Sequence, residues 1–241
     1  MDPLDTLLHK AVRAGNIKYV KALILNGVAI NAKNRYGGTS LCLAAEKNLV
    51  SIVKILLQNG ADTSARDSLL RTPLHIATEL GHHKIIKILI SNSAKIDEKD
   101  FFGLMPIHIA CGYGQNLALK MLIRNGADIE SQTSNGRTPL LVLMETIFGK
   151  NKTVEILVQT GAKVNVRNQD GNTPIHLASC YPRKSKQILM LMRYGGSIKI
   201  RNQDGLTPVE CTLKEFAFFN FDFKMRNFKV MVYNNVILPC N

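Results

Sequence analysis

Apolar residues recur along the chain at the spacing of an amphipathic helix. Around Ile52-Val53 and Ile55-Leu56-Leu57 they lie three and four positions apart, on one face of a helix. Equivalent segments return along the chain, and their leucines predict one continuous apolar column made of Leu23, Leu56, Leu89, Leu122, Leu157 and Leu191. The pattern therefore predicts a series of similar helices that pack side by side.

A six-residue motif precedes each of these segments, and its clearest copy is Thr72-Pro73-Leu74-His75-Ile76-Ala77. The threonine hydroxyl can cap the first turn of a helix. Proline suits the first helical position, because its missing N–H has no partner there in any case. The motif thus predicts another helix in each unit, with Leu74 facing the core and the small Ala77 allowing close packing.

Seven copies of the motif begin at residues 6, 39, 72, 105, 138, 173 and 207, so the intervals are 33, 33, 33, 33, 35 and 34. A turn follows each apolar segment, and Gly60, Gly126 and Gly161 suit the positive φ that often ends a helix. Ser93 replaces this glycine in the third unit. A second turn, also rich in glycine, lies before most motifs, and in the third unit Leu70 stands there without a glycine.

A period near 33 residues with this motif resembles the ankyrin-repeat family, and the resemblance covers residues 5–213. It implies an all-α repeat solenoid of stacked helix-turn-helix units, with β-hairpin fingers formed by the turns before each motif. It also implies that the motif residues have structural roles, with the histidines hydrogen-bonding across neighbouring turns; these residues are Thr72, Pro73, His75, His108 and His176.

The spacing predicts six full repeats and part of a seventh. Their expected bounds are 1–33, 34–66, 67–99, 100–132, 133–167, 168–201 and 202–214, with the first repeat acting as an N-terminal cap. We expect the Phe-rich residues 215–241 to cover the last repeat. Val236-Ile237-Leu238-Pro239 also resembles part of the box by which some ankyrin proteins, including viral host-targeting ones, recruit a ubiquitin ligase, although the box would be truncated.

No catalytic residues, cofactor or metal site are predicted. The chain lacks GxxxxGK, GxSxG and HExxH motifs, and no thiolate or carboxylate stands at a ligand spacing from His82-His83. No apolar run is long enough to span a membrane, and the start of the chain does not resemble a secretory signal. Five cysteines without a CxxC pair favour a reduced, intracellular protein of the cytoplasm or nucleus.

The net charge of +13 comes from 31 basic and 18 acidic residues. Many of the basic residues fall on the second helices, which would form an outer wall: Lys18, Lys21, Lys54, Lys84, Lys87, Lys120, Lys152, Arg183, Lys184 and Lys186. Such a wall can attract an acidic protein, nucleic acid or an anionic membrane. It can equally be a solubilising face, and no element shaped to read bases is visible.

Apolar residues occupy positions of the fingers and first helices where polar residues are usual in this family. Together with Arg71 they predict a partner-binding patch on the concave surface: Tyr36, Leu69, Arg71, Leu80, Phe101, Phe102, Leu104 and Tyr113. The alternative is that the two phenylalanines fold over neighbouring fingers and cover the core.

We therefore expect a non-catalytic, monomeric protein-protein interaction module without a small-molecule substrate. The alternatives are a substrate adaptor or host-targeting effector linked to a ubiquitin ligase, and a basic nucleic-acid-binding scaffold.

Overall fold

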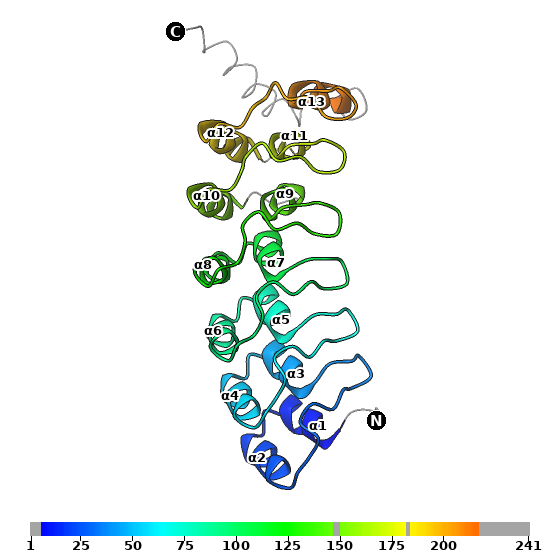
Figure 1. The fold of residues 1–241 in the computed structure, drawn as a ribbon, viewed down its shortest axis with the longest axis vertical. Helices are drawn as coiled ribbons and strands as arrows, with labels where there is room; N and C mark the ends of the chain where they lie inside the picture. Colours follow the sequence, from blue (N-terminus) through cyan, green and yellow to red (C-terminus); the bar gives the residue numbers. More distant parts are fainter. Residues whose placement is uncertain (1–5, 147–149, 182–183, 217–241) are drawn as a thin grey trace. The chain divides into compact units, whose positions relative to one another are not determined.

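The computed structural model describes residues 6–146, 150–181 and 184–216. Within them the chain forms pairs of antiparallel helices joined by tight turns, with a loop between one pair and the next (Figure 1). The first helices of the pairs are α1 (Leu7–Arg13), α3 (Ser40–Glu46), α5 (Pro73–Glu79), α7 (Pro106–Tyr113), α9 (Pro139–Glu145), α11 (Pro174–Ser179) and α13 (Pro208–Phe216). The second helices are α2 (Ile17–Leu25), α4 (Val50–Gln58), α6 (His83–Ser91), α8 (Asn116–Arg124), α10 (Asn151–Gln159) and α12 (Ser185–Arg193).

The helices divide between two compact units, the first ending at Asp128 and the second beginning at Ile129. In the first unit α3 packs between α1 and α5, and α5 packs against α7. In the second unit α11 packs between α9 and α13, and α10 packs against α12. The expected all-α stack of helix-turn-helix repeats is thereby confirmed.

The motif threonines begin the first helices as the sequence predicts. Thr39 and Thr138 have extended backbones, and their hydroxyls accept the backbone N–H of Cys42 and Leu141 in the first turn. A proline follows the cap of α5, α7, α9 and α11. These local preferences fix where each first helix starts.

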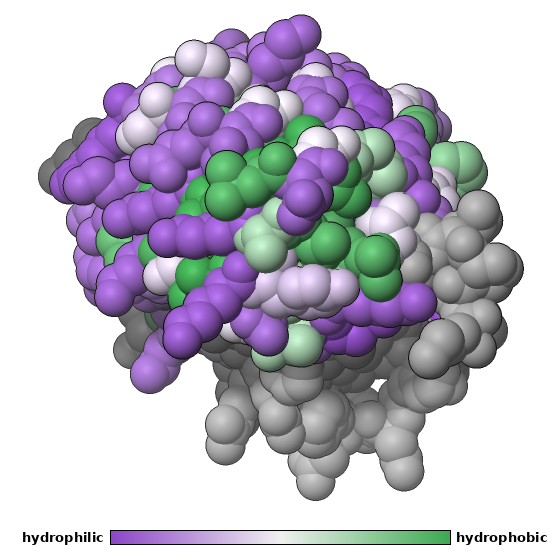
Figure 2. Space-filling model, turned by 90° about the horizontal axis from the view of Figure 1, so that it is seen from below, coloured by the Kyte–Doolittle hydropathy of each residue, from purple (hydrophilic) through white to green (hydrophobic). Residues whose placement is uncertain are grey.

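The predicted leucine column lies in the core with one exception. Leu56, Leu89, Leu122, Leu157 and Leu191 are fully buried. Leu23 is only half-buried, because α2 packs chiefly against α1 and α4 and stands at the end of the first unit. Figure 2 shows this end of the unit, where hydrophobic residues gather in the centre and hydrophilic residues surround them. Leu25 on α2 is 88% exposed.

The fingers differ in one respect from the expected β-hairpins. The finger at Asp67 is closed by only two backbone hydrogen bonds, from Asp67 N to Arg71 O at 3.1 Å and from Leu70 N to Asp67 O at 2.9 Å, and the finger at Asp100 has the same two bonds. Among the described residues the only strand-like pairing is the isolated bridge between Lys33 and Thr39. The arms of each hairpin are too short for a ladder, so the fingers are turns rather than strands.

Within each unit, side chains in the turns between paired helices tie a repeat to the one before it. His82 Nδ1 donates to the carbonyl of Ala45 at 2.9 Å, and Gln115 Nε2 donates to the carbonyl of Glu79 at 2.8 Å. In the second unit the Tyr181 hydroxyl donates to the carbonyl of Glu145 at 3.1 Å. These donors satisfy carbonyls that the end of a helix leaves unpaired. His82 therefore has a structural role.

Two predictions fall on residues outside the described part of the chain. The Phe-rich cap lies there from residue 217 onward, as does the truncated ligase-recruiting box at residues 236–239. The beginning of the first repeat, residues 1–5, lies there too.

Candidate protein-binding surface

In repeats three and six the motif histidine joins the first helix of its repeat to the finger of the next repeat. The Nδ1 atom of His75 accepts the backbone N–H of Thr72 at 3.1 Å, so its Nε2 carries the proton and donates to the Leu104 carbonyl at 3.1 Å. His176 makes the same bonds to Thr173 and to the Leu206 carbonyl. Burial lowers the pKa of both histidines below the usual range, which keeps them neutral.

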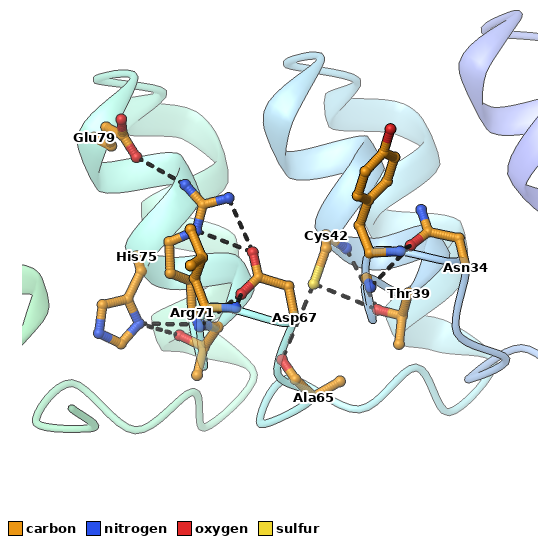
Figure 3. A network of polar contacts seen from close by, with 12 residues as sticks. Asn34, Thr39, Cys42, Ala65, Asp67, Arg71, His75 and Glu79 are labelled. Atoms are coloured by element: carbon orange, nitrogen blue, oxygen red, sulfur yellow. Dashed lines mark hydrogen bonds and ion pairs between the residues drawn. The ribbon is translucent and has the colours of Figure 1, made fainter. Parts of the chain in front are cut away.

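Cys42 and Met105 are variants of this arrangement. Cys42 stands in the histidine position of its repeat, with its Sγ 3.6 Å from Thr39 Oγ1 and 4.0 Å from the Ala65 carbonyl (Figure 3). The thiol thus reaches the same kind of partners as His75, but more weakly. Met105 replaces the motif threonine, and its backbone N–H still donates to His108 Nδ1 at 3.2 Å.

Arg71 lies at the base of a finger and is held by two carboxylates (Figure 3). Its Nε and Nη2 are both 2.9 Å from Asp67 Oδ2, and its Nη1 is 3.2 Å from Glu79 Oε2 at the end of α5. Burial lowers the pKa of Arg71, but Asp67 and Glu79 outweigh it and raise the pKa above the usual value. Arg71 therefore fixes the finger to the helix and is not an unpaired charge.

The same connection recurs in the second unit, where Arg137 Nε lies 3.0 Å from Glu145 Oε1. In both pairs the glutamate follows the arginine by eight residues and ends the first helix. This pairing was not predicted from the sequence, although the repeated Arg-to-Glu spacing is the signal that could have revealed it.

Half of the predicted patch surrounds one hollow of the first unit. Tyr36, Leu69, Arg71 and Leu80 line a groove of about 570 Å³ between two fingers and the ends of α3 and α5. Tyr36, Leu69 and Leu80 are between 42% and 57% exposed. The guanidinium of Arg35 lies 4.5 Å from the centre of the Tyr36 ring and shields one of its faces.

Phe101 and Phe102 form the tip of the next finger and do not line that groove. Their rings contact each other edge to face at 5.4 Å, and they remain 66% and 62% exposed. They cover little of the core, contrary to the alternative interpretation. Phe101 N donates to the Leu69 carbonyl at 2.9 Å, which joins this tip to the preceding finger. The preceding finger is joined in turn to Tyr36 by Ser68 N at 2.8 Å.

The remaining two residues of the predicted patch are tied to the scaffold. Leu104 is half-buried, and its carbonyl accepts the bond from His75. Tyr113 is 58% exposed at the end of α7, and a hydrogen bond to Glu79 raises the pKa of its hydroxyl. Glu79 thus connects Tyr113 with Arg71.

The turn glycines adopt the backbone that the sequence requires of them. Gly60, Gly126 and Gly161 have φ values of +85°, +94° and +96°. Leu70 and Ser93, which stand where other repeats have glycine, adopt φ values of +56° and +60°. Side chains are disfavoured in this region, so both positions hold some strain.

One residue assigned to the basic outer wall lies elsewhere. Lys184 is fully buried, and its amine donates to the Met144 carbonyl and lies 4.2 Å from the centre of the Tyr181 ring. Burial lowers its pKa to about 8. The prediction that Lys184 faces solvent was wrong, because the amine satisfies a carbonyl at the end of α9.

The described residues contain no group of three or more His, Cys, Asp or Glu side chains that could hold a metal ion. Within the same part of the chain, no helix has the length and apolarity needed to cross a membrane.

Comparison with known proteins agrees with this geometry. The family profile described as "Ankyrin repeats (3 copies)" matches residues 8–100, 74–167 and 107–204. The crystal structure of the human ASB11 ankyrin repeat domain is 25% identical, with a TM-score of 0.78 over 93% of this chain and 97% of that one. The ankyrin repeat domain of Bcl-3, a member of the IkappaB protein family, is also 25% identical, with a TM-score of 0.76 over 96% and 100% of the two chains. No curated protein sequence matches the chain.

The family profile covers most of the chain, and the repeated helix pairs carry the motif on which the resemblance rests. The chain belongs to the ankyrin repeat family, whose domains are generally protein-binding modules.

Proposed function

We propose that this chain is a non-catalytic module that binds a partner protein through the concave side of repeats two to four. The observation that carries the proposal is the exposed aromatic pair Phe101 and Phe102 at a finger tip. Exposed aromatic residues beside a groove are typical of the few positions that dominate binding energy in protein interfaces.

The fingers that carry these residues are held in place before any partner binds. Backbone hydrogen bonds join Ser68 to Tyr36 and Phe101 to Leu69, and Arg71 ties its finger to α5. A surface that is already ordered loses little conformational entropy on binding. This preorganisation supports recognition by a rigid face.

The groove beside the aromatic pair is suited to an apolar side chain of the partner with polar atoms at its edge. Tyr36, Leu69 and Leu80 supply apolar walls. Charged residues line it as well: Arg71 is paired with Asp67 and Glu79, and Arg13, Glu46 and Lys47 lie at other points of the groove. We propose that affinity comes chiefly from the apolar contacts.

The other roles raised by the sequence remain hypotheses. A ligase adaptor or host-targeting role rests on the C-terminal segment, which lies outside the described residues. A nucleic-acid-binding role rests on net charge alone. The monomeric state and the absence of a small-molecule substrate likewise remain predictions.

Affinity capture tests the proposal. The tagged chain, a Phe101→Ala/Phe102→Ala variant and a Tyr19→Ala/Tyr194→Ala control are incubated with lysate of the cells that naturally contain the protein. The control removes two exposed aromatic rings that lie outside the fingers. We expect the control to retain its partners and the Phe variant to lose them, because its affinity for them should fall about 30-fold or more. Equal capture by both variants would contradict the proposal, provided that both keep the wild-type circular dichroism.

A further inference from the structure

The opposite side of the first unit carries a second hollow, formed by α4 and α6. It has a volume of about 570 Å³, and its apolar lining is supplied by Val50, Leu57 and Ile88. Lys54, Lys84 and Lys87 also line it, and all three side chains are exposed. A hollow with an apolar floor and a basic rim is not needed for the stacking of the repeats.

The lining residues show that this hollow follows the two helices along their length. On α4 the lining includes Val50, Lys54 and Leu57, which lie four and three residues apart. On α6 it includes Lys84, Ile88 and Ser91 with the same two spacings. Each helix has nine residues and is therefore about 13 Å long. The hollow is thus a groove between two helices that lie side by side (Figure 1).

The charge around the groove has one sign. The helices α2, α4, α6 and α8 contain no aspartate or glutamate, whereas each contains at least one lysine. In the described part of the chain, Lys54, Lys84 and Lys87 form no ion pair. A neighbouring hollow between α6 and α8 shares Lys87 and adds Arg124. The groove therefore offers several unneutralised cations around an apolar floor.

We propose that this groove binds an acidic amphipathic helix of a partner protein. The apolar stripe of such a helix would cover Val50, Leu57 and Ile88, and its carboxylates would face the three lysines. Helix-in-groove recognition uses apolar residues at spacings of three and four, which the groove itself presents. The site is separate from the finger face and does not depend on the function proposed for that face.

Other occupants fit these observations less well. Nucleic acid would satisfy the lysines but would leave the apolar floor uncovered. A membrane surface is broad and does not enter a recessed groove between helices. A second copy of the chain carries the same net charge of +13 and would be repelled.

Fluorescence anisotropy with model peptides tests this proposal on the full chain. The probe is a labelled peptide of Leu, Glu and Ala, about 18 residues long so that it can form a helix, with its leucines at helical spacing. A scrambled peptide of the same composition has no apolar stripe. We expect the amphipathic peptide to bind about tenfold or more tightly than the scrambled one, because only it can cover the floor while pairing the lysines.

Charge reversal then locates the binding site. The variant Lys54→Glu/Lys84→Glu/Lys87→Glu should weaken binding about tenfold or more, since three attractive contacts become repulsive. The matched control Lys18→Glu/Lys21→Glu/Lys120→Glu changes net charge equally but alters no residue that lines the groove. It should retain binding within about threefold.

Three outcomes would overturn the proposal. These are no binding of the amphipathic peptide, equal binding of the scrambled peptide, and equal losses in the two charge-reversal variants. Tighter binding of a single-stranded oligonucleotide or of phosphatidylserine vesicles, lost in the groove variant alone, would assign the groove to those ligands instead. All six lysines are exposed, so circular dichroism is expected to show an unchanged fold in both variants.

Discussion

The Nε2 atom of His75 donates to the backbone carbonyl of Leu104, 3.1 Å away and 29 residues later in the chain. This bond joins the first helix of one repeat to the finger of the next. It places the finger tip that carries Phe101 and Phe102. The stability of the stack and the position of the proposed binding residues therefore depend on the same buried histidine.

Replacing His75 with alanine should cost more than replacing Cys42, although the two residues occupy equivalent positions. His75→Ala leaves the Thr72 N–H without its partner and removes one of the two hydrogen bonds that the Leu104 carbonyl accepts, and we expect a loss of about 2–4 kcal/mol. Cys42→Ala removes only weak sulfur contacts at 3.6 and 4.0 Å, and about 1 kcal/mol should be lost. Urea unfolding of both variants measures the difference; equal losses would show that the histidine bonds add little.

The unfolding free energy should fall as the pH drops below about 6.5. Burial lowers the pKa of His75 and His176 in the folded state below the ordinary value of 6.5. In that range the unfolded chain binds more protons than the folded chain, so acid favours unfolding. Unfolding midpoints measured between pH 7.5 and 5 test this sign. The His75→Ala/His176→Ala variant should show a weaker dependence on pH than the wild type, and an unchanged dependence would contradict the assignment.

Leu70→Gly should stabilise the chain by about 0.5–1 kcal/mol, because Leu70 has a φ of +56° that glycine adopts without strain. Leu70 is 42% exposed, so the apolar burial that its side chain loses offsets only part of this gain. The control is Gly60→Ala, at φ +85°, where an added Cβ meets nothing within 4 Å. That variant should lose about 1 kcal/mol through backbone strain alone. A destabilising Leu70→Gly would mean that the leucine side chain contributes packing that outweighs the strain.

Two leucines of the first unit provide a matched test of the core. Leu122 is fully buried in the leucine column, and Leu122→Ala should cost about 2–5 kcal/mol. Leu25 is 88% exposed on α2, so Leu25→Ala should change stability by less than about 0.5 kcal/mol. Thermal or urea unfolding gives both values. An unchanged unfolding midpoint for Leu122→Ala would show that the assignment of Leu122 to the core is wrong.

The repeated helices were predictable from the sequence because their signals are local. Thr39 and Thr138 cap helices where the motif places them, and the leucine column is buried wherever a neighbouring helix exists to cover it. Leu23 could not be distinguished from the other leucines by pattern, because its exposure depends on having only one flanking repeat. The fingers in the described part of the chain form turns rather than strands because their arms are short, and the turn residues do not determine the length of the arms.

The proposed site was predictable only in part. The exposure of Phe101 and Phe102 follows from their position in a turn, and it was predicted from the sequence. The patch divides into a groove at Tyr36 and a separate finger tip. This division depends on how the side chains pack, which a repeat pattern does not show. Lys184 was misassigned for a related reason. Its burial depends on the Met144 carbonyl, 40 residues away in the chain, and no local signal reports that contact.

Site-directed photocrosslinking tests the central claim, that a partner protein binds the finger face, most directly. A photoreactive benzoylphenylalanine is placed at position 102, at the finger tip, or at position 25, on exposed α2, in otherwise unchanged protein. After irradiation with lysate of the natural cells, covalent adducts are identified by mass spectrometry. The account predicts a specific adduct from position 102 that unlabelled wild-type protein competes away, and no such adduct from position 25. Competed adducts from position 25 alone would contradict it.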